Sequence, residues 1–119
     1  MKKKQFYQNM VDNREYIPFD NSEEAWLWCC LCESLGNQRA RGGDGRIARP
    51  CESSDIILSV KKLVQSGQLN QNHLKVLSKY GLLQIPPHEN FGQAPKECSL
   101  WREGLKLLEN ILRLKGIVA

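Results

Sequence analysis

The stretch from Ser53 to Gly81 constrains the fold most strongly, because it predicts two short amphipathic helices joined by a polar turn. The apolar residues of its first half recur with the period of a helix that buries one side; they are Ile56, Ile57, Val60, Leu63 and Val64. Gly67 follows at a point where a helix can end in the left-handed conformation. The second helix is expected to begin at the capping residue Asn70 and to end at Tyr80, before Gly81.

The second of these helices divides into two sides when its residues are placed about 100° apart. One side is mainly apolar and consists of His73, Leu74, Val76, Leu77 and Tyr80. The other side is polar and consists of Gln71, Asn72, Lys75, Ser78 and Lys79. Side chains of this second kind hydrogen-bond to base edges or contact phosphates when a helix lies in the major groove of DNA.

The charge of the same region favours nucleic acid as a partner. Between Ile56 and His88 the chain carries four lysines and no acidic residue, and Lys61 and Lys62 place two of them in the first predicted helix. An ordinary helical hairpin with a solvated polar side has a similar apolar pattern. The one-sided charge favours a nucleic-acid-binding surface, since lysines that neutralise phosphates supply much of the affinity of such surfaces.

Length and composition predict one small cytoplasmic domain that comprises residues 1–119. A chain of 119 residues, 41% hydrophobic and 25% charged, is typical of a single globular core. Its net charge of +4 is compatible with binding to a polyanion. No apolar run is long enough to cross a bilayer, and the residues after the three N-terminal lysines are too polar for a signal peptide, so we expect no export.

A very apolar helix is expected near the start of the chain. Residues 1–18 predict an N-terminal arm that is mobile at first and docks through its apolar residues near Tyr16 to Phe19. The helix that follows, capped by one of residues 20–22, is apolar nearly all round and therefore belongs at the centre of the fold. Trp26 and Trp28 are expected to be its largest buried side chains.

Residues 36–49 are rich in arginine and glycine and predict a mobile loop, because glycine at this density costs too much backbone entropy for a helix or strand. The arginines of this loop are candidates for phosphate contacts; they are Arg39, Arg41, Arg46 and Arg49. A linker that only improves solubility is an equally good interpretation of the segment.

The last helix is expected to run from about Pro95 to Lys115 and to end at Gly116, after which Ile117 and Val118 can fold back onto it. Three of its leucines lie on one line beside the main buried stripe; they are Leu100, Leu107 and Leu114. Left exposed, they would form an apolar strip of the kind that marks an interface, which favours a homodimer. The alternative is that the N-terminal arm covers them.

Five cysteines make an odd set, and we expect them to be free thiols in a reducing cytoplasm; they are Cys29, Cys30, Cys32, Cys51 and Cys98. Cys29 and Cys32 have the C-x-x-C spacing of a zinc knuckle, but a structural zinc site needs about four ligands and no second pair is present. Because free cysteine also behaves as a small buried hydrophobe, we expect no metal and no other cofactor.

Four segments resemble a group of small bacterial proteins that has no established activity. They are SEEAWLW, RPCESSDI, HLKVLSKYG and LWREGLKLLENILRLKGIV, and together they cover most of the chain from Ser22 onward. The resemblance implies a bacterial, cytosolic, single-domain protein and implies no site residue.

These patterns together predict an all-α domain with a helix-turn-helix-like pair and a long C-terminal helix. The preferred function is a small DNA-binding, regulator-like protein that uses the polar side of the second helix. A helical protein-interaction module is the first alternative, and a thiol or metal protein built on Cys29 and Cys32 is the second. Neither histidine lies in a catalytic motif, so we expect no enzymatic activity.

Overall fold

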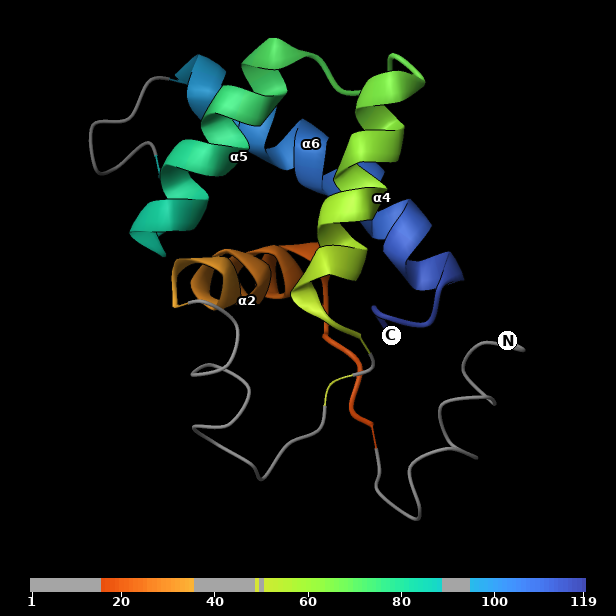
Figure 1. Cartoon of the computed structure of the whole chain (residues 1–119). Helices are drawn as coiled ribbons and strands as arrows, with labels where there is room; N and C mark the ends of the chain where they lie inside the picture. The colour runs from red at the N-terminus through yellow and green to blue at the C-terminus, as the bar shows by residue number, and fades with distance from the viewer. Residues whose placement is uncertain (1–15, 36–48, 50, 89–94) are drawn as a thin grey trace.

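The computed structural model describes residues 16–35, 49, 51–88 and 95–119. This part of the chain contains the helices α2 (Ser22–Ser34), α4 (Ser53–Gln65), α5 (Gln71–Leu83) and α6 (Pro95–Leu114) and no β-strand, which confirms the all-α prediction. Figure 1 shows α4 and α5 lying against α6, with α2 passing close to all three.

Helix α2 has the central position that its apolar sequence predicts, since it packs against α4, α5 and α6. Its first turn is capped by Asn21, whose side chain accepts a hydrogen bond from the backbone N–H of Glu24. Trp26 is buried and donates its indole N–H to the carbonyl oxygen of Leu77 at 2.9 Å. Trp28 is only partly buried and packs on the ring of Phe19, with the ring centroids 5.2 Å apart.

The predicted helix pair is present, and both of its inner ends are as expected. Gly67 has a φ of +84° just after α4, and the side chain of Asn70 accepts hydrogen bonds from two backbone N–H groups of α5. The two helices contact each other only slightly, because each packs instead on α2 and α6. The outer side of α5 is therefore left uncovered by α4.

The prediction that α5 ends at Gly81 is wrong. The helix continues to Leu83 and is closed by Gln84, which takes the left-handed conformation with a φ of +61°. Gly81 serves close packing instead, because a Cβ atom there would lie 2.5 Å from the Sγ atom of Cys30. Sequence alone does not separate a glycine that ends a helix from one that lets two helices approach.

Helix α6 ends as predicted, and the residues after it fold back onto the core. Gly116 has a φ of +79°, and the backbone N–H groups of Ile117 and Val118 both donate to the carbonyl oxygen of Leu112. Both side chains are buried. A parallel bridge pairs Val118 with Phe19, which is itself fully buried, whereas Ile17 is 47% exposed. The rest of the predicted arm, residues 1–15, lies outside the described part of the chain.

No helix in the described part of the chain has the length and apolar character needed to cross a membrane.

Candidate functional site

The outer side of α5 carries the side chains that the sequence proposed for contact with nucleic acid. All five are exposed: Gln71, Asn72, Lys75, Ser78 and Lys79. The opposite side of the helix supplies the core residues His73, Val76, Leu77 and Tyr80, while Leu74 is partly buried. The predicted division of α5 into a buried and a solvent-facing side is therefore confirmed.

The backbone of the first turn of α5 is held by two side chains. The Oδ1 atom of Asn70 accepts from the N–H groups of Asn72 at 2.9 Å and of His73 at 3.1 Å. In return, the Nδ1 atom of His73 accepts from the N–H of Asn70 at 3.2 Å. Gln71 and Asn72 thus extend into solvent from a turn in which the N–H groups of Asn70, Asn72 and His73 are already paired. The side chains of Gln71 and Asn72 bond to no described residue.

The lysines of the helix pair differ in their surroundings. Lys61, Lys62 and Lys75 are exposed and form no ion pair with any residue that the structure describes. Lys79, by contrast, lies with its Nζ atom 3.3 Å from the carboxylate of Glu97 on α6. That carboxylate also accepts the hydroxyl of Tyr80, and these contacts hold the pKa of Glu97 below its usual value. Lys79 is consequently less available to an added anion than the other three.

Arg49, which the sequence proposed as a phosphate contact in a mobile loop, is held against the fold. Its guanidinium lies 4.3 Å from the ring centroid of Phe19, donates to the carbonyl oxygen of Ile17 at 3.2 Å and is 4.0 Å from the carboxylate of Glu24. These contacts anchor Arg49 against the start of the fold, because a cation over an aromatic face and beside a carboxylate is held on both sides. The other proposed loop arginines, Arg39, Arg41 and Arg46, lie outside the described residues.

The proposed interface leucines do not form a continuous exposed strip. Leu100 and Leu107 are partly buried and pack against the core, while Leu114 is 80% exposed. The helical periodicity places these leucines beside the main buried stripe of α6. The core cluster nevertheless contacts Leu100 and Leu107, so the buried side of α6 is wider than the stripe. Residues 1–15 of the N-terminal arm, the alternative cover for these leucines, lie outside the described part of the chain.

A different group of exposed aliphatic side chains was missed by the sequence reasoning. The group, here called the apolar end, comprises Leu31, Leu35, Leu82, Leu83 and Ile85. The residue that closes α5 contacts α2 in this region, because the side-chain amide of Gln84 donates to the carbonyl oxygen of Leu27 at 2.8 Å. The sequence does not indicate the apolar end, because a helix that ends at Tyr80 excludes Leu82 and Leu83 from α5.

The five cysteines are free, and all except the partly buried Cys51 are buried. The Sγ atom of Cys29 donates to the carbonyl oxygen of Ser53 at 3.5 Å. Burial is the main cause that raises the pKa of Cys30 to about 11 and that of Cys51 to about 12, so these thiols stay protonated near neutral pH. The described residues contain no group of three or more histidine, cysteine or acidic side chains placed to hold a metal.

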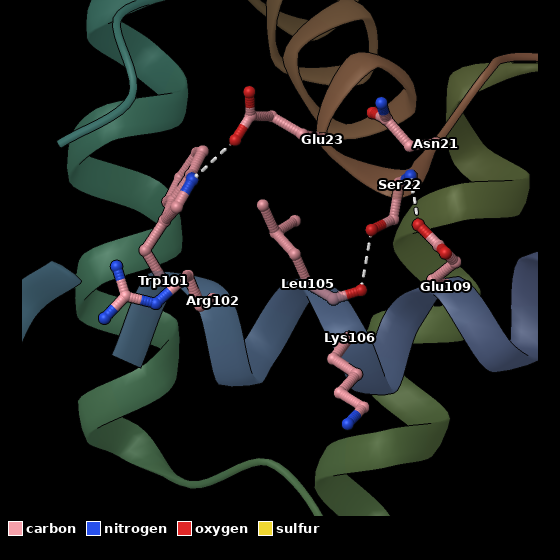
Figure 2. Close-up of a pocket in the computed structure, with 8 residues that line it drawn as sticks. All are labelled: Asn21, Ser22, Glu23, Trp101, Arg102, Leu105, Lys106 and Glu109. Carbon is pink, nitrogen blue, oxygen red and sulfur yellow. Dashed lines mark hydrogen bonds between the residues drawn. The ribbon is translucent and has the colours of Figure 1, made fainter. Parts of the chain in front are cut away.

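An open hollow of about 320 Å³ lies where the start of α2 meets α6, and Figure 2 shows its lining. The hydroxyl of Ser22 donates to the carbonyl oxygen of Leu105 at 2.6 Å, and the N–H of Ser22 donates to Glu109 at 3.0 Å. The indole of Trp101 donates to the carboxylate of Glu23 at 3.0 Å. These hydrogen bonds join α2 to α6 and leave the polar groups involved already paired with each other. We therefore assign no ligand to the hollow.

No protein-family model, curated protein or solved structure matches this chain. The resemblance to small bacterial proteins therefore stays a prediction, and no relative assigns a role to the residues described above.

Proposed function

We propose that this protein binds nucleic acid, with duplex DNA as the favoured form, through the outer side of α5 and the adjoining half of α4. The observation that carries the proposal is the set of exposed lysines Lys61, Lys62 and Lys75, which no described acidic residue neutralises. Exposed cations that no acidic side chain neutralises are the electrostatic requirement for binding to a phosphate backbone. A small regulator of DNA-dependent processes is the role that fits this surface.

The shape of α5 supports the same proposal. The helix has 13 residues, which corresponds to a length of about 20 Å, and a helix with its side chains is about 10–12 Å across. The major groove of B-DNA is about 12 Å wide, so a helix that no neighbour covers on its outer side can enter it. Amide side chains such as those of Gln71 and Asn72 can pair with adenine edges, while Ser78 can bond to several bases.

Replacement of Lys61, Lys62 and Lys75 by alanine is expected to weaken binding to duplex DNA and to reduce its salt dependence. Each lost phosphate contact lowers the slope of log K against log salt by about one, so the triple variant should lose about three. Titrations monitored by fluorescence anisotropy at several salt concentrations measure this slope. The matched control is Lys106→Ala, an exposed lysine on α6 beside the start of α2, which should leave the slope unchanged. Absence of wild-type binding to DNA or RNA even at low salt would refute the proposal.

A second candidate function, self-association as a helical interaction module, is supported by the apolar end. Its aliphatic side chains are between 39% and 65% exposed, which is unusual for residues of their size. None of them is charged, so two copies of the surface can pack together without burying an unpaired ion. The occupant that we propose is a second copy of this chain, which would also present two α5 helices to a symmetric DNA site.

Leu82→Glu combined with Leu83→Glu is expected to give a folded monomer, because both side chains already face solvent and their replacement leaves no cavity. Sedimentation or light scattering over a range of concentrations measures the mass. Leu114→Glu is the matched control, since Leu114 is more exposed but lies at the end of α6, and this variant should associate like the wild type. A wild type that is monomeric at every concentration would eliminate this candidate and leave the DNA proposal intact.

A further inference from the structure

His73 links the exposed turn at the start of α5 to α6. Its side chain is only 8% exposed, and its Nε2 atom lies 3.1 Å from the Oε1 atom of Glu103. The Nδ1 atom already accepts the backbone N–H of Asn70, so in the neutral ring the proton lies on Nε2 and is donated to Glu103. A chain of hydrogen bonds therefore runs from α6 through the imidazole to the residue that caps α5.

This linkage fixes the backbone from which Gln71 and Asn72 project. Asn70 is bonded on both sides, through its N–H to His73 and through its Oδ1 atom to the N–H groups of Asn72 and His73. The side chains of Gln71 and Asn72 remain unbonded to the described residues. A fixed backbone sets the positions from which the amide side chains extend, and their unbonded groups remain available to hydrogen-bond to base edges.

We infer that His73 and Glu103 are positioning residues that set the sequence preference of the DNA-binding surface without touching DNA themselves. The inference rests on the proposed function. His73 lies on the buried side of α5, and Glu103 bears a negative charge, so neither is suited to a phosphate contact. The affinity that is independent of sequence comes from Lys61, Lys62 and Lys75, which do not depend on this linkage.

The test uses the full chain, a pool of random-sequence duplex DNA and three variants. His73→Leu fills the buried site but removes both hydrogen bonds. His73→Gln keeps them, because a glutamine at this position of a capping box accepts the Asn70 N–H through its side-chain oxygen and carries an N–H₂ group for Glu103. Glu103→Ala removes only the anchor on α6, and it changes a side chain that is 63% exposed, so folding is retained.

Repeated selection from the pool should enrich the same sequences with wild type and with His73→Gln. With His73→Leu the preference for these sequences over the unselected pool should fall about tenfold, the effect of losing a buried hydrogen bond, while the salt slope stays that of the wild type. Glu103→Ala should reduce the preference in the same direction, and it decides the matter if His73→Leu does not fold. The salt slope separates the two proposals, since it reports phosphate contacts and neither His73 nor Glu103 is expected to make one.

Three results would overturn the inference. His73→Leu or Glu103→Ala could keep the full wild-type preference, which would show that the linkage does not position the reading residues. Wild type could bind the pool with a steep salt dependence yet enrich no sequence, in which case the phosphate-binding part of the proposed function stands and there is no readout to position. If the wild type does not bind the pool at all, the proposed function fails first, and the inference fails with it.

Discussion

Gly81→Ala should lower the free energy of unfolding by about 2 kcal/mol, although the same change in the interior of most helices is stabilising. The new Cβ atom would lie 2.5 Å from the Sγ atom of Cys30 and 2.8 Å from the Nε1 atom of Trp26. The indole cannot easily move, because its N–H is bonded to the carbonyl oxygen of Leu77 at 2.9 Å. Overpacking costs about 1–3 kcal/mol, and two contacts under 3.0 Å place this site at the upper end of that range. Subtraction of the gain in helix propensity, about 1 kcal/mol, leaves a loss of about 2 kcal/mol. Urea unfolding followed by circular dichroism measures the change.

Two further variants make this prediction specific to the contact between α5 and α2. Gly104→Ala on α6 is the matched control, since its Cβ atom would approach the Leu77 side chain no closer than 3.3 Å, and it should stay within about 1 kcal/mol of the wild type. In a Cys30→Ala background the penalty of Gly81→Ala should shrink, because the nearest clashing atom is gone. A wild-type stability for Gly81→Ala would mean that α5 does not approach α2 as closely as described.

The helix boundaries were largely predictable because caps are local signals. Asn70 directly precedes α5, and its side chain caps the helix by accepting from backbone N–H groups two and three residues further on. The sequence around Asn70 is therefore enough to predict this helix start. Gly67 and Gly116 likewise have positive φ values set by the chain immediately around them. The role of Gly81 is not predictable in this way, because the glycine is needed for close packing against Cys30 and Trp26, which are distant in sequence.

The candidate site was predictable to the extent that it lies on one helix. The periodicity of α5 gives the exposed positions directly, and the structure confirms Gln71, Asn72 and Lys75 among them. What periodicity does not give is which charges other elements neutralise. Glu97 and Glu103 on α6 pair with Lys79 and His73, and these partners are set by the packing of α6 on α5. The placement of Arg49 and the burial of Leu100 and Leu107 differ from expectation for the same reason, because contacts between separate elements determine them.

Ile117→Ala combined with Val118→Ala should reduce the free energy of unfolding by about 4 kcal/mol, an unusually large effect for two residues that follow the last helix. Ile117 is 3% exposed and Val118 is 2% exposed, and both pack in the main core cluster. Truncation of a buried Ile or Leu to alanine costs about 2–5 kcal/mol, and the smaller valine adds less. Denaturant unfolding at constant protein concentration measures the loss.

Leu114→Ala is the matched control for this second stability test. Leu114→Ala removes a side chain of the same size as that of Ile117 only three residues earlier in the chain, but the Leu114 side chain is 80% exposed, so the expected change is below about 0.5 kcal/mol. The large loss for the double variant follows from the fold-back after Gly116, where the N–H of Phe19 donates to the carbonyl oxygen of Ile117 and the N–H of Ala119 donates to that of Phe19, both at 2.9 Å. The segment before α2 and the residues after α6 are thereby hydrogen-bonded to each other over the core. Removal of the apolar side chains of Ile117 and Val118 is expected to weaken the packing of both segments. Equal effects of Leu114→Ala and the double variant would show that residues 117 and 118 do not fold back.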